Sequence, residues 1–361
     1  MLSFNTLIMR RKYLLPLFLI LQIIAIQILA YYPAFVTHFY SEGWFLMVSK
    51  FMRTLFGKIP FSVGDCFYFL LLIIVLKKSW DARKSWKKKW KSNLLKVASV
   101  FSIFYFLFHL LWAMNYYREP LSEKMNIKKD YSTAELLAFT EKLITKTNAV
   151  HLQITKDANQ KVINPHTPNE IFSMTQNGYD NLSKIYPFFD YKTPSIKKSI
   201  FSFPLTYMGF GGYLNPFTNE AQVNDKLPLY GFPVVVCHEM AHQIGYASES
   251  EANFIGFLSA SKNDDLYFQY AAYSGALRNC LHNIEMKDKT QINHFKSKIN
   301  PGIVANYKES KLFWEHYQTP IATGFDYFYD HFLKMNQQKE GIESYSKYVD
   351  LMVNYYKNKA L

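Results

Sequence analysis

The sequence predicts an α+β protein in which N-terminal transmembrane helices precede a mainly helical domain with a small β-sheet. Three observations lead to this prediction. Long apolar segments are confined to the first third of the 361 residues. The rest of the chain repeats apolar residues at helical spacing, whereas residues 198–213 combine β-forming residues with glycines. We therefore expect a membrane domain (1–115), a linker (116–131) and a second domain (132–361).

Three apolar segments in the membrane domain approach the roughly 20 residues that cross a hydrocarbon layer. They run from about 13 to 31, 59 to 76 and 97 to 114. A cleaved signal peptide is the alternative for the first, because small residues occur near Ala30. Its length favours a retained span. Asp65 is expected near the outer membrane interface and His109 in a buried polar contact.

The distribution of positive charge predicts the topology. The formal net charge is +13, and much of it lies in residues 77–96, between two apolar segments. Such a loop is typical of the cytoplasmic side of a membrane and not of a nucleic-acid site. With three spans, the second domain lies outside the cytoplasm. We expect an inner-membrane, multi-pass protein with a periplasmic domain, contacts with membrane lipids and no nucleic-acid partner.

The elements of the second domain follow from helix-start signals and periodicity. A capping box at Ser132 predicts a helix to about 148, and the start signal Thr167-Pro168-Asn169-Glu170 predicts a helix that ends just before Pro187. Alternation over 150–155 predicts a short strand. The β-rich and glycine-rich residues 198–213 predict either a strand at the edge of the sheet or an ordinary hairpin. Further helices are expected over 249–261, 266–285, 291–297, near 312–314, over 327–335 and over 345–356.

The strongest functional signal is His-Glu-x-x-His at residues 238–242. On a helix, His238 and His242 project from one face and can bind a zinc ion together. Glu239 then lies beside the metal, where it can accept a proton from an activated water. Gly245 supplies a helix stop. This pattern predicts metal-assisted hydrolysis; the alternative is a buried helix whose histidines bond to neighbours.

A third metal ligand is expected from the acidic segment that follows. Ser248 and Glu251 have the spacing of a capping box, which would give Glu251 a structural role. Glu249 then lies in the first turn of the next helix, with Asn253 one turn later as a polar support. We favour Glu249 as the ligand and keep Glu251 as the alternative.

These residues carry a resemblance to known enzymes. His238-Glu239-x-x-His242 followed by Glu249-x-x-Ala252-Asn253 resembles the gluzincin metallopeptidases. The resemblance implies a zincin-like fold, Zn²⁺ bound by His238, His242 and Glu249, Glu239 as general base and Asn253 behind the ligands. The separation between His242 and Glu249 is shorter than is typical of gluzincins.

The whole chain resembles an uncharacterised family of bacterial, mainly Bacteroidetes, membrane proteins in which several spans precede an HExxH domain. Further matching residues lie at 211–213, 216–221 and 340–345. The expected function is therefore a membrane-anchored zinc metallopeptidase with a peptide or protein substrate. Two alternatives stay open: a non-catalytic scaffold or sensor with a zincin fold, and a zinc hydrolase with a non-peptide substrate.

Three other features are less specific. Glu220 either assists the site or is a strand-end carboxylate. The group that stabilises an oxyanion is unassigned, with His282 and several tyrosines as candidates. Cys237 precedes the first histidine and is expected to be a small buried residue. The oligomeric state has no sequence signal.

Overall fold

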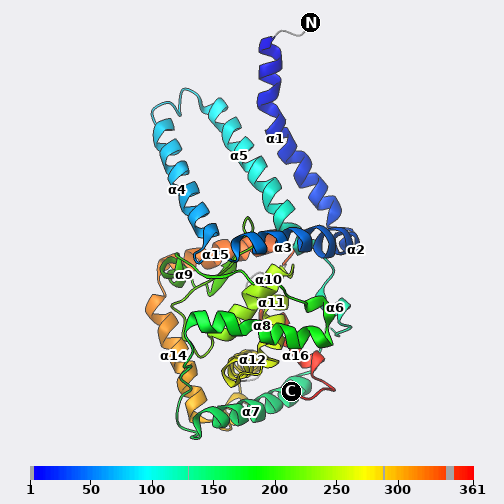
Figure 1. The fold of residues 1–361 in the computed structure, drawn as a ribbon, viewed down its shortest axis with the longest axis vertical. Coiled ribbons are helices and arrows are strands. Elements are labelled where there is room, and N and C mark those ends of the chain that lie inside the picture. Colours follow the sequence, from blue (N-terminus) through cyan, green and yellow to red (C-terminus); the bar gives the residue numbers. More distant parts are fainter. Residues whose placement is uncertain (1–3, 129, 288, 339–344) are drawn as a thin grey trace.

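The computed structural model describes residues 4–128, 130–287, 289–338 and 345–361. Three long helices project from one end of a helical body, and a layer of helices crosses their base (Figure 1). The membrane-proximal elements are α1 (Phe4–Leu29), α2 (Pro33–Phe35), the π-helix η1 (Val36–Trp44), α3 (Phe45–Phe56), α4 (Val63–Ala82), α5 (Trp90–Leu111), the 3₁₀-helix η2 (Ala113–Tyr117) and α6 (Leu121–Lys124).

The body contains the remaining elements. In chain order these are α7 (Thr133–Thr155), α8 (Pro168–Ile185), η3 (Pro187–Phe189), β1 (Ile196–Lys198), α9 (Ser202–Tyr207), β2 (Gly212–Leu214), β3 (Ala221–Val223), α10 (Phe232–Gln243), α11 (Glu249–Ser261), α12 (Leu266–Lys287), α13 (Ile292–Lys296), α14 (Pro301–Tyr317), α15 (Pro320–Met335) and α16 (Tyr345–Tyr355). The predicted combination of mostly helix with a small sheet is confirmed.

Two helices in the described part of the chain are long and apolar enough to cross a membrane, judged by length and composition. They are Lys12–Leu29 within α1 and Trp90–Leu111, with mean hydropathies of 2.0 and 1.9. Only 11% of either segment is buried, so neither resembles a core helix. The middle predicted span forms α4, but Asp65, Lys77 and Lys78 leave it short of that composition.

The layer at the base of the long helices lies between the first two predicted spans. Residues 33–56 are helical throughout and pack against the body. Side chains of η1 bond to the free carbonyls at the end of α5: Tyr40 to those of His109 and Leu110, and Trp44 to that of Leu110. The layer therefore fixes the direction in which α5 leaves the body.

The predicted linker also has structure. It includes η2 and α6, and Tyr117, Leu121 and Ile127 are buried. Leu121 and Ile127 belong to the main hydrophobic core of the body. Residues 116–128 consequently hold the long helices against the body.

The helix starts predicted at Ser132 and Thr167 are confirmed, and both are capping boxes. Ser132 with Glu135 opens α7, and Thr167 with Glu170 opens α8. The predicted strand at 150–155 is wrong, because α7 continues to Thr155 and ends at Lys156 in the left-handed conformation. Val150 and His151 are buried on this helix, so tertiary packing overrides the local alternation.

The sheet has three strands in the order β1-β3-β2, with β3 parallel to β1 and antiparallel to β2. The β-rich reading of residues 198–213 is correct only at its ends, because α9 occupies the middle. Strand β2 lies at the edge of the sheet beside α10 and pairs with the next strand, β3, in antiparallel fashion.

Buried carboxylates join α4 to the body. Glu220 accepts hydrogen bonds from the backbone N–H groups of Val63 and Gly64, at the start of α4. Asp65 accepts hydrogen bonds from Ser199 and from the Tyr213 hydroxyl. Glu220 thus acts as a structural carboxylate at the end of a helix, where the helix dipole favours negative charge.

Candidate metal centre

Helix α10, which carries His238 and His242, ends in a turn that orients His242. Gly245 has a φ of +91°, and the N–H groups of Gly245 and Tyr246 bond to the carbonyls of His242 and Ala241. This is a Schellman motif, in which glycine avoids the strain of a left-handed residue. The turn brings the Tyr246 carbonyl within 2.7 Å of His242 Nδ1.

That contact fixes the tautomer of His242. A carbonyl can only accept, so Nδ1 carries the proton and Nε2 keeps a free lone pair. Burial lowers the pKa of His242 to about 4, and the imidazole is therefore neutral. A neutral imidazole held by a backbone carbonyl is the usual form of a metal-binding histidine.

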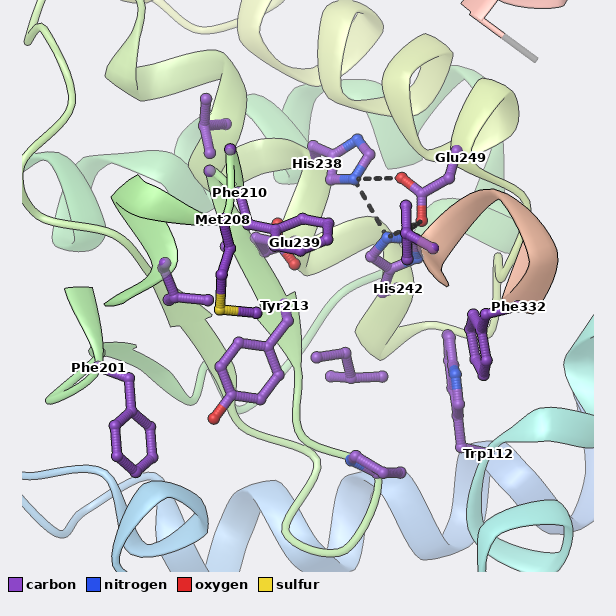
Figure 2. A pocket seen from close by; sticks show the side chains of 18 of the residues that line it. Trp112, Phe201, Met208, Phe210, Tyr213, His238, Glu239, His242, Glu249 and Phe332 are labelled. Carbon is purple, nitrogen blue, oxygen red and sulfur yellow. Dashed lines mark hydrogen bonds and ion pairs between the residues drawn. The ribbon is translucent and has the colours of Figure 1, made fainter. Parts of the chain in front are cut away.

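Helix α11 supplies the carboxylate. Gly256 lets it approach α10 closely, since a Cβ at this position would lie 3.0 Å from the backbone nitrogen of His238. Glu249, in the first turn of α11, turns its side chain toward both histidines (Figure 2). The Tyr329 hydroxyl of α15 donates a hydrogen bond of 2.7 Å to Glu249 Oε1.

Three candidate ligand side chains converge at one point. The Nε2 atoms of His238 and His242 are 3.1 Å apart, Glu249 Oε2 lies 3.3 Å from that of His238, and Glu249 Oε1 lies 3.7 Å from that of His242. Ligands about 2.0–2.1 Å from a zinc ion at tetrahedral corners lie about 3.3–3.4 Å from one another. The chemistry and spacing of these atoms therefore fit a zinc ion with one open position.

Charges at the site are strongly coupled. Burial raises the pKa of Glu249, but its hydrogen bond to His238 and its further interactions with both histidines outweigh this and lower that pKa to about 2. For His238, burial lowers the pKa, and its hydrogen bond to Glu249 and the nearby carboxylates reverse the direction. Glu249 is consequently the anionic member of the group.

Glu239 lies beside these atoms and is not part of their hydrogen bonds. Ligand atoms of His238, Glu239 and His242 all lie within 4.8 Å of one another. Burial raises the pKa of Glu239 to about 8, and its Oε2 atom has no partner among the described residues. Gly212 of β2 lies against it, because a Cβ there would be 2.7 Å from Glu239 Oε1.

The structure separates the two candidate third ligands. Glu251 accepts a hydrogen bond of 2.6 Å from the backbone of Leu121 and lines a different cavity, with Arg118 and Lys347. The predicted capping box is wrong: Ser248 precedes α11 but its side chain makes no cap hydrogen bond. Glu251 has a tertiary partner in its place.

Asn253 lies next to His238 and contributes to the raised pKa of that imidazole. The other predicted features lie away from the ligands. Glu220 and Asp65 anchor α4, and His109 bonds to the carbonyl of Tyr105. Cys237 is buried, as expected. The matching segment 340–344 lies outside the described residues.

Tyr329 is the site residue that sequence reasoning missed. It follows Glu249 by 80 residues, on a helix that was recognised only as apolar periodicity. His282, a sequence-based candidate for stabilising an oxyanion, is not among the described residues that line the cavity.

The ligand atoms line a cavity of about 670 Å³. Its walls come from α4, α5, α9, β2, α10, α11 and α15, and most of its lining is apolar or aromatic. The edge strand β2 forms one wall through Gly212, Tyr213 and Leu214. Trp112, at the end of α5, packs edge-on against His242 with ring centroids 5.7 Å apart.

Comparison with known proteins gives one match. A family model described as "Protein of unknown function (DUF3810)" matches residues 40–353. No curated protein and no solved structure matches the chain.

Proposed function

The chain belongs to the DUF3810 family, and we propose that it is a membrane-anchored zinc metallopeptidase. One observation carries this proposal. Two imidazoles and one carboxylate converge with separations close to those expected for ligands of a tetrahedral zinc ion, and a separate buried carboxylate, Glu239, lies beside them. The resemblance of this residue pattern to gluzincins, including Asn253 behind His238, supports the same function.

The roles of the residues follow from their positions. His238, His242 and Glu249 would hold the metal, with Tyr329 and the Tyr246 carbonyl orienting two of them. A zinc ion bound there would act as a Lewis acid that activates water and polarises a carbonyl. Glu239 would accept the proton of the attacking water, a role that suits a carboxylate whose pKa burial raises to about 8.

An open strand edge favours a peptide over other substrates. Gly211 and Asn215 of the β2 region bond to Asn224 and Glu220 on the β3 side. Antiparallel alternation therefore directs the backbone groups of Gly212 and Leu214 to the open edge. An extended peptide can pair with these groups while its carbonyl lies near Glu239.

The membrane arrangement is part of the proposal. Helix α4 exposes a continuous apolar surface that includes Phe69, Leu72 and Val75, and we infer that it is a third span beside α1 and α5. The basic loop 77–96 would then lie in the cytoplasm and the body in the periplasm of a Gram-negative inner membrane.

The test uses the full-length chain in detergent, with Glu239→Gln as the variant and Glu251→Gln as the matched control. Bound zinc is measured by mass spectrometry and cleavage with a broad peptide library. We expect one zinc per chain in all three proteins, with cleavage lost only in Glu239→Gln.

Other outcomes distinguish the alternatives. Wild-type protein without stoichiometric zinc would overturn the metal assignment. Zinc without hydrolysis of any peptide, ester or glycoside would favour a scaffold or sensor. Hydrolysis of a non-peptide library alone would assign a different hydrolase.

A further inference from the structure

We propose that this site receives its substrate from the membrane surface, as an extended apolar polypeptide segment that adjoins a membrane anchor. The inference rests on the proposed peptidase function and adds the class of substrate. Three sets of observations support it: the origin of the cavity walls, the exposed faces of the helices around the cavity, and the charge of its lining.

The long helices themselves form part of the cavity wall. Tyr68 of α4 and Phe108 of α5 line it together with Trp112. Trp112 contacts His242, so the wall made by α5 extends to the ligands. In Figure 2 the ribbons of the membrane-proximal helices run directly below the cavity residues. A group held by the site therefore lies at the level where these helices leave the body.

Helix α3 lies at the same level and exposes its apolar face. Phe45, Ser49 and Arg53 face the body, at a spacing of four residues. Ser49 bonds to Asn219 and to the Gln243 carbonyl, and Arg53 to the Lys192 carbonyl. The opposite face presents Met47, Phe51 and Leu55, all more than half exposed. A helix in water has the reverse pattern, whereas a helix in a lipid interface has this one.

Helix α15 borders the cavity and carries a similar stripe. Ile321, Phe328 and Met335 are exposed at a spacing of seven residues. The inner face of α15 contributes Tyr329 and Phe332 to the cavity. In Figure 1, α15 and α3 lie across the base of the long helices. The exposed faces of α3 and α15, together called the collar, comprise Met47, Phe51, Leu55, Ile321, Phe328 and Met335.

The collar commits to lipid because α3 and α15 lie across the base of α1, α4 and α5, whose own side chains are largely apolar and exposed (Figure 1). Large exposed apolar patches mark membrane or protein contacts, and here the collar adjoins the base of helices of membrane-spanning composition. With the collar in the interface, the cavity would lie beside the same layer, because α4, α5 and α15 contribute to its walls. A substrate already concentrated in that layer gains effective concentration at the site.

The lining selects a polypeptide over a phospholipid. No lysine or arginine is among the described residues that line the cavity, and its ionisable side chains are the two histidines, Glu239, Glu249 and tyrosines. Apart from the proposed zinc ion, a phosphate headgroup would therefore meet carboxylates and no cationic side chain. An extended apolar segment meets aromatic walls and the open edge of β2.

The test compares one peptide pool in two forms. Each peptide has eight randomised residues between a fluorophore and a quencher, with or without an N-terminal palmitoyl chain. Full-length protein with zinc is reconstituted into phosphatidylcholine vesicles. We expect the palmitoylated pool to be cleaved at least about 10-fold faster, and this advantage to disappear in detergent.

Failure of the inference and failure of the proposed function are distinguishable. Equal rates for both pools in vesicles would overturn delivery from the membrane and leave the peptidase intact. Cleavage of neither pool by zinc-loaded protein would overturn both.

A variant pair tests the collar. Phe51→Asp with Phe328→Asp should remove most of the advantage of the palmitoylated pool, while cleavage of the soluble pool and zinc content stay unchanged. Leu152→Asp is the matched control, because Leu152 is exposed on α7, at the far end of the body (Figure 1). An unchanged advantage in the collar variant would show that these faces do not contact lipid, and a docked protein would then be the better explanation.

As an independent readout, a Phe51→Cys substitution is made in a Cys66→Ser background and labelled with an environment-sensitive dye. The fluorescence emission of this dye should shift to the blue in vesicles. The same dye at Leu152 should not shift. A dye at Phe51 that reports water would contradict the position of the collar.

Discussion

Helices α11 and α3 differ in the kind of side chain that they turn toward the body: α11 buries apolar residues on nearly all sides, whereas α3 turns polar residues inward and exposes apolar ones. Helix α11 is buried on nearly all sides, and Phe254, Ile255 and Phe257 pack in the main core. Helix α3 places Ser49 and Arg53 against the body and leaves Phe51 63% exposed. Both are amphipathic or apolar segments of similar length, so their composition alone does not indicate which side faces solvent.

The difference shows that the surroundings of a helix decide which of its faces is buried. Around α11, apolar contacts drive packing because the alternative is water. Around α3, polar side chains find partners in the body, and in the proposed membrane interface the outer face would meet lipid, where polar groups are costly.

The largest effect is expected from truncating the two phenylalanines. Phe254→Ala should lower the free energy of unfolding in detergent by about 3–5 kcal/mol, the usual cost of a cavity in a packed core. Phe51→Ala should change it by less than about 0.5 kcal/mol, because no body contact is lost. Thermal or chemical unfolding of the purified proteins measures both. Equal losses would mean that α3 packs as a core helix.

The carboxylates of α11 come next. Glu249→Ala should weaken zinc binding more than about 100-fold, since even the outer partners of metal ligands contribute 10- to 100-fold. Glu251→Ala should leave affinity within a few-fold, because its carboxylate is bound to the Leu121 N–H. Competition with a fluorescent chelator gives both affinities. Zinc lost only from Glu251→Ala would reverse the assignment of the third ligand.

The next effect concerns strand β2, which packs beside α10. A Cβ at Gly212 would lie 2.6 Å from the Gln222 carbonyl and 2.7 Å from Glu239 Oε1, so Gly212→Ala must displace the carboxylate. We expect cleavage to fall about 100-fold with zinc retained, as misplacement of about 1 Å can cause. Gly231→Ala is the control, with no atom within 4 Å of the added methyl. Full activity of Gly212→Ala would exclude Glu239 as the base in this position.

The smallest effect concerns the inner face of α3. Arg53→Leu should destabilise the protein by about 2 kcal/mol, because a charged hydrogen bond to the Lys192 carbonyl is lost. Its guanidinium also lies 4.7 Å from the centre of the Tyr191 ring. Lys50→Leu, at an exposed position, should be neutral in the same unfolding assay. A stabilising Arg53→Leu would indicate that this face prefers apolar contacts, like α11.

Local signals in the sequence predicted much of the body. The boxes at Ser132 and Thr167 depend on residues three positions apart, and both form. The same logic failed at Ser248, because Glu251 bonds to Leu121, 130 residues earlier in the chain. A cap is predictable only where no distant group competes for its side chain.

For the candidate site, the sequence placed His238, His242 and Glu249 together because helical spacing and one short turn connect them. Tyr329 could not be predicted, since its contact depends on how α15 folds over the cavity. The sequence also could not show which face of α3 lies against the body, because periodicity identifies two faces and not their surroundings.

The junction between the long helices and the body has a consequence for biogenesis. Helices α3 and α4 are synthesised long before their partners: Glu220 follows Gly64 by 156 residues, and Gln243 follows Ser49 by 194. Until those residues emerge from the ribosome, the buried donors of α3 and α4 have no native partner. The membrane-proximal layer therefore completes its folding only after α10 has been translated, and a chain cut near residue 117 would separate the two halves of this junction.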